Sequence, residues 1–309
     1  MREIESEKRT SETRKKELIS KKNTITSKIT TAKGTESTIK RLMEEAKKIR
    51  RSIKEKMIEI ETLFENKDYV IINKPAGLVV HYDGKTAEPN VTDWVLKNYP
   101  MAADVGEPIN LSNGEVIKRP GIVHRIDRDT SGVMVIALNQ SAFLHLKSHF
   151  QSREVEKTYH AFVYGVVKKD ADVIDRPIGR SRKDFRLWSA QRFARGELRD
   201  AITDYRVLAR GQVQGEGRSS GGDGGEGVTF LEAKPHTGRT HQIRVHLKAI
   251  NHPVVCDKLY APKRPPMLGF ARLALHAREI KFKDMDGAEI SATAPYPKDF
   301  AHAIEAIKN

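Results

Sequence analysis

The sequence predicts an α+β domain with a mainly antiparallel sheet, preceded by a basic N-terminal segment. From residue 63 onward, short runs rich in β-branched and aromatic residues predominate, and stretches of helical periodicity are few. The strands and helices do not alternate regularly, which favours a mixed, mainly antiparallel sheet over a parallel one. Residues 1–60 differ in composition from the rest, because they contain 18 Lys and Arg against 10 Asp and Glu.

The first 62 residues are predicted to form two parts. Residues 1–38 are rich in Ser, Thr, Lys and Glu and poor in large apolar residues, which predicts a disordered basic tail. Residues 39–62 are predicted to form a basic amphipathic helix that docks on the following domain, touches RNA or pairs with a partner helix. Its apolar face repeats at spacings of three and four residues, at Ile39, Leu42, Ala46, Ile49, Ile53, Met57 and Ile60.

A single domain is predicted over residues 63–309. Its strand-like runs are 69–75, 133–138, 159–165, 203–208 and 228–233. Residues 141–151 and 240–250 show helical spacing instead. The segment 211–227 contains eight glycines in seventeen residues and is predicted to be a flexible connection between two paired strands.

Composition narrows the class of protein. The 309-residue chain carries 55 Lys and Arg against 41 Asp and Glu, a formal net charge of +14, which makes nucleic acid the leading class of partner. Its single cysteine, Cys256, excludes an intrachain disulfide and cysteine-based zinc or iron–sulfur sites. The longest apolar run, 133–138, is far shorter than the roughly 18 residues that span a bilayer. Because its start has no recognisable signal or transit peptide, we expect an intracellular protein, cytoplasmic by default, with an organelle left open.

Two glycine patterns and a histidine group match familiar motifs without the structural context those motifs need. Residues 217–221 fit G-x-S-x-G and residues 222–227 fit G-x-G-x-x-G, but neither lies between a strand and a helix. His241 and His246 are five residues apart, whereas a zinc-binding helix needs two histidines about four apart on one face. The sequence therefore predicts no hydrolase elbow, no dinucleotide site and no metal site.

One chemically dense segment, residues 120–132 (PGIVHRIDRDTSG), leads directly into the predicted strand 133–138. Two arginines alternate with two aspartates there. If the segment is extended, Arg125 and Asp127 share one face while Ile126 points into the core. The alternative interpretation is a surface cluster of ion pairs that contributes little stability.

A second segment, residues 234–247 (KPHTGRTHQIRVHL), opens the predicted helix 240–250. Gly238 frees the backbone there, and Thr240 is a candidate cap. Arg244 lies near the helix N-terminus, where a cation is unfavourable unless an anion faces it. Asp127 is a candidate for that partner, and another Asp or Glu is the alternative.

These segments resemble the signatures of the RluA family of pseudouridine synthases, the branch that acts on large-subunit ribosomal RNA and transfer RNA. The central match is GIVHRIDRDTSG at residues 121–132. Four further blocks follow the family's order and extend the resemblance to roughly residues 63–301. They are NKPAGLVVH at 73–81, EKTYHAFVYG at 156–165, TGRTHQIRVHL at 237–247 and ARLALHA at 271–277.

The resemblance implies a fold and an activity. The fold would be the family's curved, mainly antiparallel mixed sheet with flanking helices and a central cleft. The activity would be isomerisation of a specific uridine to pseudouridine in structured RNA, as part of rRNA or tRNA processing. No cofactor and no metal is implied, RNA is the expected partner, no membrane is involved, and we expect a monomer.

The resemblance also implies roles for five residues. Asp127 would be the catalytic aspartate that attacks the sugar C1′ or the base C6 of the uridine, and Arg244 would pair with it. Tyr159 would stack on the uracil and assist proton removal from C5, and Ile243 would form an apolar wall of the pocket. Arg125 would enter the base stack as the uridine flips out. Replacing Arg244 by alanine is therefore expected to cost activity without unfolding the domain.

The chain departs from the family pattern at two points. Ile126 stands where leucine is commoner, which is a nearly isosteric change. No S4 RNA-binding domain, which many relatives carry first, is recognisable before residue 63, so the basic N-terminal segment is a candidate replacement. The basic loop 175–184 is expected to contact the RNA backbone.

Two other functions are alternatives. One is an RNA-binding assembly factor of this fold without catalysis, which would need none of Asp127, Tyr159 and Arg244. The other is a glycosidase, which is disfavoured because Asp127 and Asp129 are too close in the chain to flank a glycosidic bond.

Overall fold

The computed structural model describes most of the chain beyond residue 58 and a few residues before it. These are residues 59–82, 88–110, 114, 116–182, 184, 187–191, 194–213 and 226–308, with residues 16, 17, 19–24, 27, 38, 40, 41 and 43–45. The predicted tail 1–38 and helix 39–62 therefore lie largely outside the described residues. The described residues of the tail are helical, which differs from the disorder predicted for it.

The helix predicted over residues 39–62 is wrong at its C-terminal end, because residues 61 and 62 belong to strand β1 (Glu61–Glu65). Glu61 and Thr62 pair with Asn73 and Ile72 of the neighbouring strand. Ile60, which was predicted on the apolar face of the helix, is instead buried in a core cluster of the domain. Pairing with a neighbouring strand and burial of an adjacent apolar residue override the helical periodicity there.

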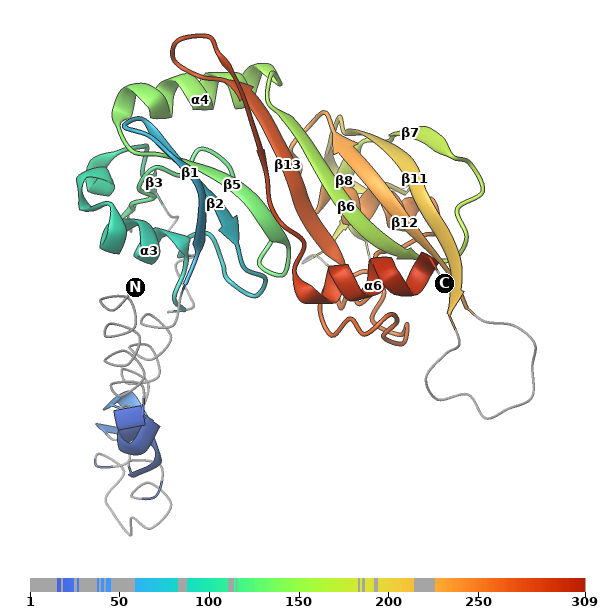
Figure 1. The fold of residues 1–309 in the computed structure, drawn as a ribbon, viewed down its shortest axis with the longest axis horizontal. Coiled ribbons are helices and arrows are strands. Elements are labelled where there is room, and N and C mark those ends of the chain that lie inside the picture. The colour runs from blue at the N-terminus through green and yellow to red at the C-terminus, as the bar shows by residue number, and fades with distance from the viewer. Residues whose placement is uncertain are drawn as a thin grey trace.

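The described residues of the domain are built on one nine-stranded sheet with the order β1-β2-β5-β13-β6-β12-β11-β7, and β14 pairs with β13 (Figure 1). Every pairing is antiparallel except that of β5 with β13. The predicted α+β class is thus confirmed. The remaining strands are β2 (Tyr69–Lys74), β5 (Ser131–Ala137), β6 (Glu156–Tyr164), β7 (Ala171–Asp175), β11 (Ile202–Val213), β12 (Glu226–Pro235), β13 (Leu275–Lys283) and β14 (Glu289–Thr293).

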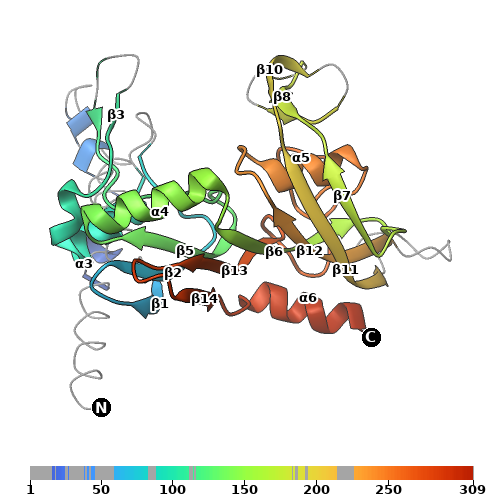
Figure 2. The same ribbon diagram turned by 90° about the horizontal axis from the view of Figure 1, so that it is seen from above.

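Helices cover both faces of the sheet. Figure 2 shows α4 (Gln140–Ser152) and α5 (Gln242–Ala249) on one side and α6 (Lys298–Lys308) on the other. No helix among the described residues is long and apolar enough to cross a lipid bilayer. The smaller elements are α3 (Val91–Asn98), η1 (Pro100–Asp104), β3 (Ile109–Asn110), β4 (Val116–Ile117), β8 (Ile178–Arg180), β9 (Trp188–Ser189) and β10 (Arg195–Arg199).

The predicted elements within the domain match observed ones. The strand-like runs correspond to β2, β5, β6, β11 and β12, and the two helical stretches correspond to α4 and α5. The glycine-rich segment 211–227 is shorter as a connection than predicted, because β11 continues to Val213 and β12 begins at Glu226. Residues 214–225 lie outside the described part of the chain.

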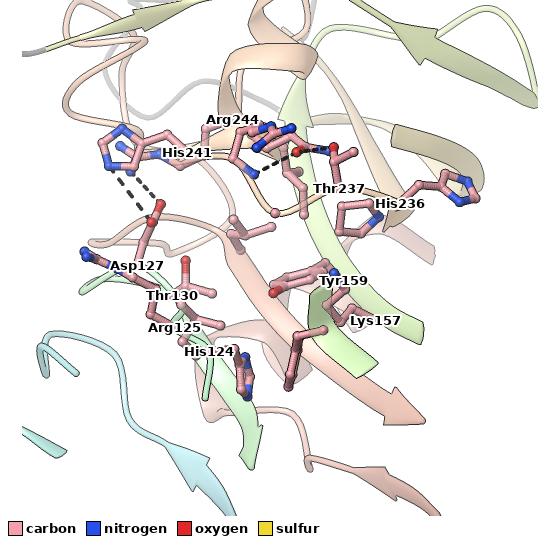
Figure 3. A pocket seen from close by; sticks show the side chains of 18 of the residues that line it. His124, Arg125, Asp127, Thr130, Lys157, Tyr159, His236, Thr237, His241 and Arg244 are labelled. Carbon is pink, nitrogen blue, oxygen red and sulfur yellow. Dashed lines mark hydrogen bonds and ion pairs between the residues drawn. The ribbon is translucent and has the colours of Figure 1, made fainter. Parts of the chain in front are cut away.

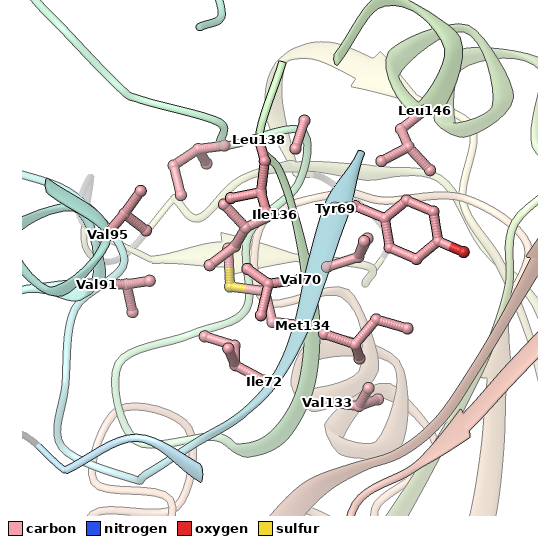
Figure 4. Packing of buried hydrophobic residues seen from close by; sticks show 14 of the residues in the cluster. Tyr69, Val70, Ile72, Val91, Val95, Val133, Met134, Ile136, Leu138 and Leu146 are labelled. Atoms are coloured by element: carbon pink, nitrogen blue, oxygen red, sulfur yellow. The ribbon is translucent and has the colours of Figure 1, made fainter. Parts of the chain in front are cut away.

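Two hydrophobic clusters lie along the sheet. In the first, β2 and β5 are packed between α3 and α4, with Val70, Ile72, Met134 and Ile136 completely buried (Figure 4). Removing such a side chain from water stabilises the fold by roughly 1.5–3 kcal/mol. The second cluster joins β6, β12 and β13 to α5 and α6, around residues such as Phe162.

The two halves of the sheet meet where β5 pairs with β13 over only two residue pairs. Ser131 lies opposite His276, and Gly132 lies opposite Ala277. Gly132 has a φ of +116°, and a Cβ there would lie 2.1 Å from the carbonyl oxygen of Ala277, so only glycine permits this approach. A 2.9 Å hydrogen bond between Ser131 Oγ and His276 Nδ1 closes the same junction. The segment that precedes β5 therefore lies at the boundary between the two halves.

Two buried histidines lead us to expect that acid destabilises the domain. Burial lowers the pKa of His160 and of His276 from 6.5 to about 4. Between these values the unfolded chain binds more protons than the folded one, so stability that is present above pH 6.5 is lost as the pH falls towards 4. Each group accounts for roughly 3 kcal/mol of that loss.

Urea unfolding at a series of pH values measures this effect. We expect the free energy of unfolding to fall by more than roughly 2–3 kcal/mol per pH unit near pH 5, because these two histidines together take up close to two protons on unfolding and His124, whose pKa burial lowers to about 3, takes up a further one. His276→Asn removes one of these groups and is expected to reduce that slope by about 1 kcal/mol per pH unit. Equal slopes in the two proteins would contradict the assignment.

Candidate active site

A cavity of about 480 Å³ opens where the two halves of the sheet meet. Its walls come from the segment before β5, the end of α4, the start of β6, the loop after β12 and the first turn of α5 (Figure 3). All five residues that the family resemblance singled out line this cavity. They are Arg125, Asp127, Tyr159, Ile243 and Arg244.

Asp127 lies in the loop before β5. Its neighbour Ile126 is buried in the first core cluster, as predicted, and the alternation of an extended backbone directs Arg125 and Asp127 away from that core. The Asp127 side chain keeps 22% of its accessible surface, and its Oδ2 accepts a 2.9 Å hydrogen bond from Nη1 of Arg244. The predicted ion pair between Asp127 and Arg244 is therefore present.

Arg244 is held from behind by Asp257, which the sequence did not reveal. Nε and Nη2 of Arg244 each donate to one carboxylate oxygen of Asp257 at 2.8 Å. Oδ1 of Asp257 also accepts the backbone N–H groups of Leu259 and Tyr260, both at 3.0 Å. This two-pronged contact leaves Nη1 of Arg244 for Asp127. Burial lowers the pKa of Arg244, but the bonds to Asp257 outweigh burial and raise that pKa above its ordinary value, so the guanidinium stays charged.

Helix α5 begins without a side-chain cap, so the predicted cap at Thr240 is wrong. Its N-cap residue is His241, in the left-handed conformation with a φ of 56°. Instead of capping, Gln242 Oε1 accepts hydrogen bonds from Thr237 Oγ1 at 2.6 Å and from the Arg239 N–H at 3.0 Å. These bonds hold the preceding loop against the helix start and so place the first turn of α5 beside the cavity.

The loop that carries Asp127 is anchored by the buried side chain of Lys74. Its Nζ donates to the carbonyl oxygens of Pro75, Leu78 and Arg128 at 2.9, 2.7 and 3.0 Å. Burial lowers the pKa of Lys74 to about 7, while three carbonyl acceptors match the three N–H donors of an ammonium group. Lys74 and Arg128 are far apart in the chain, so the spacing of residues carried no signal for this anchor.

The other three predicted residues form walls and rim of the cavity. Burial and the negative charge of Asp127 raise the pKa of Tyr159 above its ordinary value of 10, so its phenol is protonated at neutral pH. Ile243 is buried in the first turn of α5 and forms an apolar wall. Arg125 is exposed at the rim, where it also lines a second, smaller cavity of about 220 Å³.

His241 is a further neighbour of Asp127. Its Nε2 lies 4.0 Å from Oδ1 of Asp127, and its Nδ1 lies 2.9 Å from the hydroxyl of Tyr260. Burial lowers the pKa of His241, so the ring is neutral at neutral pH and Arg244 is the cation that pairs with Asp127. The sequence drew attention to His241 only as a rejected zinc ligand, because its closeness to Asp127 depends on the fold.

The cavity is lined by more cationic than anionic side chains. Among the described residues of its lining, Asp127 is the sole carboxylate, and the exposed Asp129 does not take part. A glycosidase needs two carboxylates on either side of the bond, so this lining does not suit that alternative. The cationic side chains of the lining are Arg125, Arg153, Lys157, Arg239 and Arg244.

Comparison with known proteins identifies the family. Residues 68–249 match the family model described as RNA pseudouridylate synthase. An uncharacterised RNA pseudouridine synthase of Aquifex aeolicus is 41% identical over 212 residues, which are 68% of this chain and only 59% of that protein's length. The ribosomal large subunit pseudouridine synthase D of Haemophilus ducreyi is 33% identical over 263 residues, which cover 81% of this chain and 71% of that protein.

A solved structure agrees with the sequence matches. The human protein RNA pseudouridylate synthase domain containing 4 superposes with a TM-score of 0.58 at 25% identity, over 80% of this chain and 92% of that one. The expected pseudouridine synthase fold and the resemblance to the RluA family are thereby confirmed. The chain belongs to the family of RNA pseudouridine synthases, of the RluA type, whose members are the enzymes that isomerise uridine in RNA to pseudouridine.

Proposed function

We propose that this chain isomerises a specific uridine in structured RNA and that Asp127 is the nucleophile. The observation that supports this most directly is one carboxylate, paired with Arg244, in a cavity whose other charged side chains are cations. A cationic lining suits RNA, because the phosphates give that substrate its negative charge. The ion pair positions the carboxylate, and an ionised carboxylate is the form that attacks as a nucleophile.

In the proposed reaction the target nucleotide flips from its base stack into the cavity, and Arg125 takes the vacated place. The uracil lies between Tyr159 and Ile243. Asp127 attacks C1′ of the sugar or C6 of the base, the N1–C1′ bond breaks, and the held uracil turns until C5 bonds to C1′. The bond between Asp127 and the substrate then breaks, which regenerates the carboxylate. The proton lost from C5 is balanced by one gained at N1. Tyr159 accepts the C5 proton only after giving up its own, because its raised pKa keeps the phenol protonated.

The proposed substrate is ribosomal or transfer RNA. The relative from Haemophilus ducreyi is, by its name, an enzyme of the large ribosomal subunit. The basic segment 175–184, predicted as a loop and proposed to contact the RNA backbone, contains strand β8 and so forms part of a three-stranded sheet of order β10-β8-β9 that protrudes on the α5 side of the domain (Figure 2). Within that sheet the guanidinium of Arg180 lies 4.0 Å from the ring centroid of Trp188, which holds the arginine in place.

The test is transcriptome-wide mapping of pseudouridine in cells that lack the protein, complemented with the native chain or with Asp127→Asn. We expect one or a few uridines to lose the modification and only the native chain to restore it. Restoration by Asp127→Asn would contradict the role of Asp127. An unchanged map would favour the alternative function, an RNA-binding assembly factor that does no chemistry.

A further inference from the structure

The cavity contains a lysine for which the proposed reaction has no role. Lys157 lies two residues before Tyr159 on β6, so the two side chains project from the same face of the strand into the cavity (Figure 3). The Lys157 Nζ lies 6.0 Å from the ring centroid of Phe150. Phe150 in turn stacks on His124 with 4.5 Å between the ring centroids. The lysine is thus placed against aromatic rings rather than in solvent.

The charge of Lys157 has no protein partner in the described part of the chain. No carboxylate there forms an ion pair with its ammonium, although the side chain is partly buried. Burial alone lowers the pKa of Lys157, and no acidic neighbour opposes it. Burial, together with the positive charge of Lys157, lowers the pKa of His124 to about 3, so the His124 ring stays neutral. A partly buried cation without an anion costs free energy, which a bound anion would recover.

A second cation without an ion pair among the described residues, the exposed Arg153, lines the same cavity. Arg153 follows α4 in the left-handed conformation, with a φ of 65°, and its side chain forms no ion pair with any described residue. A residue other than glycine in this conformation is uncommon. Lys157 and Arg153 together offer a compact ammonium and a planar guanidinium, the two groups with which proteins bind phosphate.

We propose that Lys157 and Arg153 form an anion subsite that binds the phosphodiester next to the flipped uridine. This inference rests on the proposed function, because it takes RNA as the substrate. Successive residues of a strand rise by about 3.3 Å, so Lys157 lies about 7 Å along β6 from Tyr159. That spacing suits the sugar–phosphate of a nucleotide whose base is stacked on Tyr159. The subsite would hold the RNA strand while the base turns within the cavity.

Binding of a fluorescein-labelled dodecauridylate across a range of salt concentrations tests the subsite without turnover. Lys157→Met keeps the apolar stem and removes the charge. We expect it to weaken binding about 5- to 10-fold and to lower the slope of log Kd against log salt by about 0.7, the value for one lost phosphate contact on a single strand. Lys157→Arg should restore binding to within about twofold, because a guanidinium also binds phosphate.

Lys169→Met is the matched control, because it removes the same charge from an exposed lysine that pairs with Asp172 outside the cavity. We expect it to leave affinity and slope unchanged. An unchanged slope in Lys157→Met, or an equal change in Lys169→Met, would overturn the subsite.

On RNA from cells that lack the protein, Lys157→Met should raise KM and spare kcat. A loss confined to kcat, which Lys157→Arg does not rescue, would instead place Lys157 in the chemical step and overturn the proposal.

The position of the phosphate is tested with a short RNA that contains the mapped uridine. A neutral methylphosphonate on one side of that uridine should weaken binding by the native chain and cause no further loss in Lys157→Met, because each change removes the same contact. Losses that add at every position would overturn the assignment. If only the subsite proposal fails, the native chain still forms pseudouridine. If the proposed function fails, the native chain forms none.

Discussion

Asp127→Asn is expected to abolish pseudouridine formation, with a loss of about 10⁴-fold or more in the rate of the chemical step. The amide is nearly the same size as the carboxylate, and its oxygen can still accept the 2.9 Å hydrogen bond from Arg244. The neutral amide is not a nucleophile, so the covalent step is lost while the cavity keeps its shape. RNA affinity should stay within a few-fold of the native value. The measurement is nucleoside mass spectrometry of RNA from cells that lack the protein, after incubation with each variant.

Asp129→Asn is the matched control for this experiment. It removes the same charge from the same loop, but Asp129 is exposed and does not line the cavity. We expect near-native turnover from this variant. Turnover by Asp127→Asn, or an equal loss in both variants, would show that Asp127 is not the nucleophile.

Arg244→Ala is expected to lose both activity and stability. The sequence predicted a loss of activity alone, since it indicated only the contact with Asp127. The structure places Asp257 behind Arg244, with a side chain that has no solvent exposure. Removing one partner of a buried ion pair leaves the other charge uncompensated, which costs about 3–5 kcal/mol. Urea unfolding should therefore show a lower free energy of unfolding, and the pseudouridine assay should show no product.

A double variant separates the two effects. Arg244→Met with Asp257→Asn removes both charges and keeps groups of similar volume, so we expect it to recover much of the stability. Activity should stay absent, because Asp127 still lacks its cation. Recovery of activity together with stability would mean that Arg244 serves the fold alone. Unfolding of Arg244→Ala at the native denaturant midpoint would contradict the role of Asp257.

Local signals in the sequence were strong around Asp127. The segment 120–132 is continuous, and the strand that follows it fixes which side chains face inward, so the buried position of Ile126 and the shared face of Arg125 and Asp127 were predictable. That Arg244 needs an anion was also predictable, because a cation near a helix N-terminus is unfavourable without one, and the family resemblance implied that Asp127 is its partner. The cap at Thr240 was a local prediction too, and it failed because hydrogen bonds from the preceding loop to Gln242 take the place of a cap.

The anchors behind the site left no such signal. Asp257 lies in a turn after α5, and only the path of the chain brings its carboxylate under Arg244. Lys74 lies at the end of strand β2, and its contact with the carbonyl oxygen of Arg128 forms only because the fold brings the loop that follows Asp127 across the end of that strand. The boundary near residue 61 was mispredicted for the same kind of reason. Its helical periodicity was real, but pairing with β2 decided the conformation.

The sequence by itself determined the class of fold, the family and the five candidate residues that line the cavity, because strand composition and the five family blocks are properties of short continuous segments. The tertiary structure alone decided how those residues are held and charged. Asp257, Lys74 and the junction at Gly132 act across long separations in the chain, and the pKa of a side chain such as Tyr159 depends on burial and on neighbouring charges. This burial and these neighbouring charges are present only when the two halves of the sheet are packed together beside the cavity.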